Sequence, residues 1–360
     1  MKKDVVIIGA GPAGIFTAIE MLRKGSKKSI LIIEKGQSIE KRRCPKDKTG
    51  KCVSCKPYCH ITTGFSGAGA FSDGKLSLSY EVGGDLPDLI GADKAQDTIN
   101  YTDKIYLEFG ADEHIEGLGN AEEVKEIRKR AIRAGLKLVD CPIRHLGTEK
   151  AQSLYYSIEQ YLLNNGVEIL FGYECKNLIL ENQVCKGVQI TNGSYSEEIF
   201  CDHTIIATGR RGADWLEGLC TEHNIAHQSG TVDIGVRVEM KDIIWREFSS
   251  QIYEPKILYR TKTFEDRTRM FCFNQGGLVS AENNHGVITA NGHSFAQPEK
   301  KTENCNFAIL SSIHFDGDFQ KPTEYAENIA RNTNFAAEGN IMVQSALNAL
   351  GTVYVAANTA

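Results

Sequence analysis

Short β-branched runs and helical periods alternate along the first part of the chain. Residues 4–8, DVVII, form an apolar run typical of a buried strand, and a helical pattern, IFTAIEMLRKG, follows them. This pattern ends near Gly25, and a second apolar run, SILIIEKG, begins four residues later. Strand, helix and strand in this order predict a parallel pair with a right-handed crossover.

The middle of the chain predicts a long loop, three helices and a series of short strands. Residues 42–84 show no sustained periodicity, so we expect a long loop there. The second helix has a capping pair, Asn120 and Glu123, and a stop at Gly135. The strand candidates predict a β-meander that leads into a last buried strand. The helices lie near residues 95–109, 121–135 and 150–164, and the strand candidates read VEILFGY, KNLILEN, VCKGVQIT and EEIFCDHTIIATG.

Composition and charge limit the kinds of molecule that the protein is expected to bind. The formal net charge is -5, which provides no broad basic surface for nucleic acid, so we expect a small-molecule substrate. The first apolar run is too short for a signal peptide, and no stretch approaches the roughly 20 apolar residues that span a bilayer. We therefore expect a cytoplasmic protein without membrane contact.

A glycine-rich turn separates the first strand from the first helix. Gly9, Gly11 and Gly14 form a GxGxxG pattern that also contains Pro12 and Ala13. In this context Gly9 permits the tight turn, Gly11 admits a pyrophosphate and Gly14 allows close helix packing. Glu34 closes the second strand, where a carboxylate accepts hydrogen bonds from an adenosine ribose and repels a 2′-phosphate. The alternative is a glycine-rich turn that matches by chance.

A later strand favours FAD over NAD as the dinucleotide that the glycine-rich turn binds. Residues 204–209, TIIATG, end a buried strand in a small-residue turn at Ala207, Thr208 and Gly209. With the preceding meander, this pattern resembles the superfamily of two-dinucleotide-fold FAD oxidoreductases. The resemblance implies bound FAD, with NAD(P)H as a possible electron donor. No second GxGxxG follows, so a nicotinamide nucleotide would not use a second Rossmann domain of the usual kind.

The glycine-rich loop over residues 64–75 is a third cofactor candidate. Its backbone N–H groups predict a nest against the flavin pyrophosphate or ring, whereas the alternative is a flexible loop. Ser72 and Lys75 are expected near the flavin pyrimidine, and Arg42 and Arg43 either contact phosphate or face water. The cofactor candidates here are Gly67, Ala68, Gly69, Ser72, Asp73, Gly74 and Lys75, together with Lys35 and Arg43.

Several separated motifs resemble a bacterial family of FAD-dependent dehydrogenases. The glycine-rich loop, the cysteine run before it, RHLGT at residues 144–148 and DIGVRVE at residues 233–239 carry this resemblance over residues 1–340. The superfamily's C-terminal Gly-Asp flavin motif is missing from residues 341–360, so we expect a truncated or divergent copy.

Four cysteines in the long loop are candidate metal ligands. Cys44, Cys52, Cys55 and Cys59 follow the spacing C-x7-C-x2-C-x3-C, with His60 adjacent. Four thiolates at such spacing can wrap a zinc ion or an iron-sulfur cluster. A redox pair of Cys52 and Cys55, or reduced structural cysteines, are the alternatives.

The catalytic candidates are one arginine and two histidines. His145, Arg237 and His293 are residues that can bind a substrate carboxylate or donate a proton, although a structural role is the alternative for each histidine. The favoured function is an FAD-dependent oxidoreductase that passes hydride through flavin N5. The alternatives are a flavin-dependent RNA-modifying enzyme and a non-catalytic nucleotide-binding or metal-binding protein.

These elements predict an α/β fold, with a Rossmann-type FAD-binding domain of parallel sheet and β-meander and an inserted mixed α+β cap domain. The predicted segments are residues 1–90 (Rossmann core with the cysteine-rich and glycine-rich loop), 91–145 (helical insertion), 146–212 (FAD-binding domain continued), 213–340 (substrate or cap domain) and 341–360 (C-terminal segment).

Overall fold

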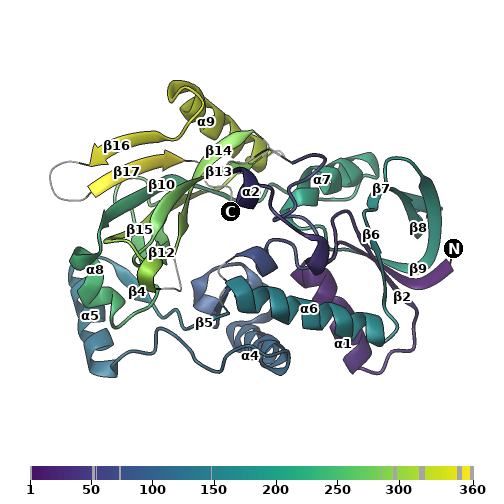
Figure 1. The fold of residues 1–360 in the computed structure, drawn as a ribbon, viewed down its shortest axis with the longest axis horizontal. Coiled ribbons are helices and arrows are strands. Elements are labelled where there is room, and N and C mark those ends of the chain that lie inside the picture. Colours follow the sequence, from purple (N-terminus) through teal and green to yellow (C-terminus); the bar gives the residue numbers. More distant parts are fainter. Residues whose placement is uncertain are drawn as a thin grey trace. The chain divides into compact units, whose positions relative to one another are not determined.

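The computed structural model divides into two compact units (Figure 1). It describes residues 2–50, 53, 55–72, 74–146, 148–284, 286–294, 298–315, 321–346 and 351–356. The first unit comprises Met1–Gly74, Glu108–Ala111 and Leu146–His227, and the second comprises Lys75–Leu107, Asp112–His145 and Gln228–Ala360. The domain boundaries expected from the sequence stay predictions.

The first unit is built on a six-stranded sheet of order β6-β2-β1-β9-β8-β7. β1 lies between β2 and β9, and β1, β2, β6 and β9 run parallel, whereas β7, β8 and β9 form an antiparallel meander. The strands are β1 (Lys2–Ile8), β2 (Ile30–Glu34), β6 (Glu168–Phe171), β7 (Glu174–Glu181), β8 (Val184–Thr191) and β9 (Ser196–Ile206). This topology confirms the predicted Rossmann-type α/β fold and its meander.

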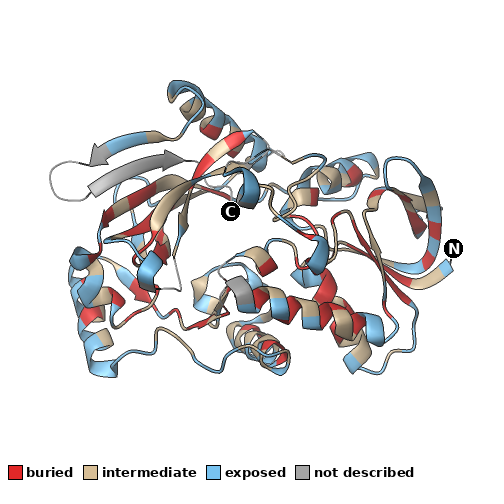
Figure 2. Ribbon diagram, viewed as in Figure 1, coloured by how far each residue is buried: buried red, intermediate tan, exposed pale blue. Residues whose placement is uncertain are grey.

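Apolar side chains on both faces of the central strands hold this sheet together, since Val5–Ile8 and Ile30–Ile33 are all buried. Val6 pairs with Leu31 on one side and with Thr204 on the other. Val6 and Leu31 are fully buried, as β-branched and leucine side chains of a central parallel strand should be. Figure 2 shows buried positions along the central strands. The core therefore fixes the carboxyl ends of β1, β2 and β9 beside one another.

Two helices of the first unit, α1 and α6, lie where the sequence predicts them, whereas the short helix α2 falls in the segment expected to be a loop and α7 was not predicted. α1 starts with Pro12 at its first turn, and Gly25 after it has φ +72°, a conformation that glycine adopts without strain. The predicted third helix is confirmed as α6, along which buried and exposed residues alternate at helical spacing (Figure 2). The helices are α1 (Pro12–Arg23), α2 (Lys46–Thr49), α6 (Thr148–Asn164) and α7 (Ala213–Glu222), with short 3-10 turns η1 (Ile39–Lys41), η2 (Gly69–Phe71) and η4 (Arg210–Gly212).

The second unit is centred on a seven-stranded sheet of order β16-β17-β10-β15-β12-β11-β4. Two small sheets, β13-β14 and β3-β5, complete it. The strands are β3 (Lys75–Ser77), β4 (Lys137–Val139), β5 (Ile143–His145), β10 (Val232–Lys241), β11 (Lys256–Arg260), β12 (Arg267–Asn274), β13 (Leu278–Asn284), β14 (Val287–His293), β15 (Asn304–Ile313), β16 (Met342–Ala346) and β17 (Gly351–Ala356).

The helices of the second unit include the two others expected from the sequence, α4 and α5. Asn120 caps α5 by accepting a hydrogen bond from the Glu122 N–H, and Gly135 follows the helix at φ +73°. Among the described residues, no helix has the length and apolar character needed to cross a bilayer. The helices are α3 (Leu86–Ile90), α4 (Ala92–Glu108), α5 (Ala121–Arg133), α8 (Asp242–Ser249) and α9 (Pro322–Ala336), with 3-10 turns η3 (Tyr80–Val82) and η5 (Pro298–Lys300).

Candidate functional site

The glycine-rich turn after β1 requires two of its three glycines for folding. A Cβ atom on Gly9 would lie 2.5 Å from the Ala207 carbonyl oxygen, and one on Gly14 would lie 2.0 Å from the Gly9 carbonyl oxygen. Gly11 differs, since a Cβ there meets nothing within 4 Å. Gly11 also precedes the N-terminus of α1, whose unpaired N–H groups attract anions. The open face of Gly11 is therefore a cradle that fits a pyrophosphate.

Glu34, the last residue of β2, stabilises this turn by two hydrogen bonds. Its Oε2 accepts a hydrogen bond from the Ala10 N–H at 2.9 Å, and its Oε1 accepts one from the Gly36 N–H at 2.8 Å. The carboxylate is only 6% exposed. Each oxygen keeps a further lone pair, so a ribose hydroxyl can still donate to Glu34. Glu34 thus holds the turn in shape and places negative charge at its edge.

The glycine-rich loop folds against the same turn. The Ser66 N–H donates to the Ala10 carbonyl oxygen at 2.7 Å, and the Phe65 N–H donates to the Gln37 carbonyl oxygen at 3.0 Å. Gly67 has φ +59°, and a Cβ on it would lie 3.9 Å from the Gly11 Cα. The loop therefore lies beside the open face of Gly11, where the sequence predicts a phosphate nest.

A third turn, which follows β9, lies against the first turn. The Ala207 N–H donates to the Ile8 carbonyl oxygen at 2.8 Å. Arg211 donates to the Thr62 hydroxyl at 3.1 Å, and the Lys35 ammonium donates to the Arg211 carbonyl oxygen at 3.5 Å. Three turns that are distant in sequence, 9–14, 64–69 and 207–212, thus meet at the carboxyl ends of neighbouring parallel strands, where such sheets bind nucleotides.

Comparison with known proteins agrees with this geometry. Residues 4–41 match the family model described as "FAD binding domain". The first unit has the Rossmann-type topology described above. The match includes most of β1, the glycine-rich turn, α1, β2 and Glu34, which are the parts that hold a dinucleotide in Rossmann folds.

One curated relative and several solved structures are similar to the chain. An uncharacterized protein of Clostridium beijerinckii is 25% identical over 323 residues, covering 87% of this chain and 52% of that protein. The L-amino acid deaminase of Proteus vulgaris with its specific insertion deleted is 14% identical, with a TM-score of 0.37, and the match covers 67% of this chain and 61% of that one. The glycerol-3-phosphate dehydrogenase of Bacillus halodurans complexed with FAD is 12% identical, with a TM-score of 0.41, and the match covers 93% of this chain and 53% of that one. The chain spans about half the length of the curated relative that it matches.

Arg42 is a residue of the first unit whose surroundings the sequence did not indicate. It does not face water, because it is 1% exposed and donates to the backbone carbonyl oxygens of His60 and Gly67. Arg43 beside it is exposed, and its role as a cofactor ligand stays a prediction. Two adjacent arginines give no signal in sequence as to which one is buried.

The end of the glycine-rich loop continues into the second unit. The Ser72 hydroxyl donates to the Gly69 carbonyl oxygen at 3.0 Å and accepts from the Gly74 N–H at 3.2 Å, so it shapes the loop. The Lys75 ammonium is 3.4 Å from the Glu254 carboxylate and donates to the Phe273 carbonyl oxygen at 3.2 Å, all within the second unit. Asp73 lies outside the described residues.

The four-cysteine metal site stays a prediction. Cys44, Cys55 and Cys59 are free and partly buried, and Cys52 lies outside the described residues. Within the part of the chain that is described, no group of three or more His, Cys, Asp or Glu residues is arranged to hold a metal ion. The His60 Nδ1 is 3.2 Å from the Arg43 carbonyl oxygen.

The catalytic candidates occupy two places in the second unit. His145 ends β5, and its Nδ1 is 3.1 Å from the Tyr253 hydroxyl. Arg237 is 2% exposed and donates to the Asn306 Oδ1 at 2.6 Å. A Cβ on Gly292 would lie 2.1 Å from the Arg237 guanidinium, so Arg237 packs beside the residue that precedes His293. The structure thus gives His145 a partner, Tyr253, that the sequence did not indicate.

Buried ionisable side chains gather near His145 and Tyr253. The Lys75 ammonium lies 5.7 Å from the centre of the Tyr253 ring. Burial, with a further contribution from Glu254, raises the pKa of the Cys141 thiol to about 11, and burial lowers the pKa of Lys256. Perturbed groups with specific charge partners are typical of functional sites, although structural networks share this property.

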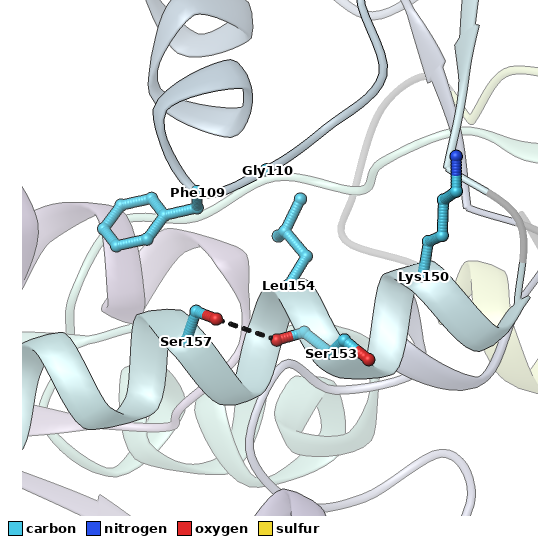
Figure 3. Close-up of a pocket in the computed structure, with 6 residues that line it drawn as sticks. All are labelled: Phe109, Gly110, Lys150, Ser153, Leu154 and Ser157. Atoms are coloured by element: carbon cyan, nitrogen blue, oxygen red, sulfur yellow. Dashed lines mark hydrogen bonds between the residues drawn. The ribbon is translucent and has the colours of Figure 1, made fainter.

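Figure 3 shows a pocket of about 420 Å³ in the first unit, which is separate from the three turns. Phe109 and Gly110 follow α4, and the remaining lining residues project from α6. Ser157 donates to the Ser153 carbonyl oxygen at 3.1 Å, which is an intrahelical bond. None of the residues singled out in the sequence lines this pocket, which is lined by Phe109, Gly110, Lys150, Ser153, Leu154 and Ser157.

Proposed function

We propose that this protein is an FAD-dependent oxidoreductase that acts on a small organic molecule. The observation that carries the proposal is the open face of Gly11 within a turn whose other two glycines are packed against backbone. The match of residues 4–41 to the FAD binding domain family supports it. When bound, FAD supplies hydride transfer at its N5 atom.

Residues of the FAD-binding unit fit the adenosine half of the cofactor. The N-terminus of α1 offers N–H groups to the pyrophosphate, and Glu34 offers a carboxylate to the ribose. A 2′-phosphate at that ribose would face the Glu34 charge at close range, which costs several kcal/mol in a buried site. The site therefore favours FAD or another dinucleotide without that phosphate.

Groups suited to proton transfer come from the second unit. A phenol hydrogen-bonded to an imidazole, as in Tyr253 and His145, can hold or move a proton at a substrate oxygen or nitrogen. We infer that this pair serves the substrate, with NADH or NADPH as the electron donor in the cytoplasm. The acidic net charge supports a small molecule as substrate rather than RNA.

A visible absorption spectrum of the anaerobically purified protein tests the proposal. Flavin bands that bleach when NADH or NADPH is added are the expected result. A colourless protein that takes up no added FAD would contradict the proposed function. Bound flavin that neither nucleotide reduces would contradict the nicotinamide donor and leave FAD binding in place.

A further inference from the structure

The Arg42 side chain is buried against the glycine-rich loop and donates hydrogen bonds to several backbone carbonyl oxygens. Its Nε donates to the His60 carbonyl oxygen at 2.8 Å, and its terminal nitrogens donate to the carbonyl oxygens of Ile61, Phe65 and Gly67, the last at 2.7 Å. The guanidinium also lies 4.4 Å from the centre of the Phe71 ring. One side chain therefore fixes four peptide groups in residues 60–67, which lead into and begin the glycine-rich loop.

The contacts of Arg42 determine which way the N–H groups of the loop point. In a planar trans peptide the C=O and N–H bonds point in opposite directions. The Phe65 carbonyl faces Arg42, and the N–H of the same peptide, that of Ser66, accordingly points away and donates to Ala10 in the glycine-rich turn. The Gly67 carbonyl also faces Arg42, so the Ala68 N–H of the same peptide is turned away from the guanidinium. Gly67 itself lies beside the glycine-rich turn, since a Cβ on it would lie 3.9 Å from the Gly11 Cα.

We propose that Arg42 is a positioning residue for the FAD pyrophosphate, acting through the Gly67–Ala68 peptide without contacting the cofactor. This inference rests on the proposed function. By binding the carbonyl oxygens of residues 60–67, Arg42 fixes the orientation of the Gly67–Ala68 peptide, keeps the Gly67 carbonyl oxygen on its own side and leaves the Ala68 N–H on the other. Backbone N–H groups oriented in this way form anion-binding concavities.

The charge of Arg42 acts in the same direction. An arginine guanidinium stays protonated near neutral pH. A cation held behind the loop, in a site of low dielectric, stabilises a pyrophosphate in front of it.

The Gly64 position explains why the guanidinium fits. Gly64 has φ +129°, and a Cβ on it would lie 2.7 Å from the Arg42 Cδ. The glycine thus leaves room for the arginine stem to pass under the loop. The glycine content of this loop serves the buried arginine as well as the ligand face.

Titration of the apoprotein with FAD, ADP and adenosine tests the role of Arg42. In Arg42→Met the Kd for FAD and ADP should rise about tenfold or more, because an oriented donor and a charge are lost. The Kd for adenosine, which lacks phosphates, should stay unchanged. Arg42→Lys keeps the charge without the planar fork of donors and should recover part of the affinity. Lys41→Gln removes an exposed charge from the preceding residue and should bind as wild type does.

A second variant separates positioning from general loss of stability. Val188→Ala removes two methyl groups from the fully buried core of β8, far along the chain from the loop, and should lower thermal stability without changing the Kd for ADP. The positioning role is wrong if Arg42→Met binds FAD with wild-type affinity, or if adenosine affinity falls by the same factor as ADP affinity. Failure of the wild-type protein to bind FAD would instead remove the proposed function.

Discussion

The phenolic oxygen of Tyr253 lies 3.1 Å from the Nδ1 of His145, a contact between residues 108 positions apart. His145 in turn pairs with Lys75 across the two short strands β3 and β5. Lys75 reaches Glu254, the residue after Tyr253. Three distant segments of the chain therefore supply one group of proton donors and acceptors in the second unit.

Removing the Tyr253 hydroxyl should cost a modest amount of stability. Tyr253→Phe keeps the ring beside Lys75 but leaves the imidazole without this hydrogen bond, so the free energy of unfolding should fall by about 0.5–1.5 kcal/mol. Urea denaturation followed by circular dichroism measures the change. Tyr259→Phe, in the same unit but more exposed, should leave stability within about 0.5 kcal/mol of wild type. Equal effects of the two changes would mean that the contact to His145 is not formed in solution.

Gly11 and Gly14 of the first turn should respond differently to the same substitution. Gly11→Val should fold, because Gly11 has φ -75° and no atom within 4 Å of the added Cβ, yet it should lose FAD because the side chain fills the phosphate cradle. Gly14→Val should fail to fold stably, since its Cβ would overlap the Gly9 carbonyl oxygen. Flavin content and the thermal midpoint, measured on both variants, separate the two effects. Wild-type flavin content in Gly11→Val would refute the assignment of the cradle.

Sequence reasoning succeeded where a local pattern determines structure. The β-branched run around Val6, the GxGxxG turn and the stop at Gly25 each depend on neighbouring residues alone, and the structure confirms the strand, turn and helix that they predict. The burial of Arg42 and the contact of Tyr253 with His145 were not predicted, because the partners of these side chains are carbonyl oxygens and a histidine brought close only by tertiary folding. A backbone carbonyl carries no residue identity, so no sequence pattern reports a side chain that binds to it.

Glu34 should be sensitive to loss of its charge even without a ligand. Each carboxylate oxygen accepts a backbone N–H, and an amide can accept only one of them. Glu34→Gln therefore sets an NH₂ group against the N–H of Ala10 or Gly36 in a buried place, and the free energy of unfolding should fall by roughly 1–3 kcal/mol. Chemical denaturation of the apoprotein gives this value, and titration with FAD should show weaker binding. Glu222→Gln, an exposed change in the same unit, is the control. Unchanged stability in Glu34→Gln would show that the Glu34 contacts contribute nothing to the turn.

Glu159 should make stability depend on pH in the opposite sense to an exposed carboxylate in an ion pair. Burial raises the pKa of Glu159, outweighing the hydrogen bond from the Ile39 N–H and the attraction of Arg42. Because the pKa of the folded state exceeds the unfolded value, stability is greatest below the unfolded pKa of about 4.5 and is lost as pH rises through the raised pKa. Glu159→Gln keeps an acceptor for Ile39 without the charge.

The Glu159→Gln variant should therefore be more stable than wild type near pH 7, and the difference should vanish near pH 4. Urea denaturation at a series of pH values between these limits measures it, with Glu222→Gln as the matched exposed control. A variant whose advantage grows toward low pH would show that attraction to Arg42 dominates over burial. In that case the buried guanidinium would depend on Glu159 as its counter-ion. Removing the carboxylate would then weaken the hydrogen bonds of Arg42 to the backbone carbonyl oxygens.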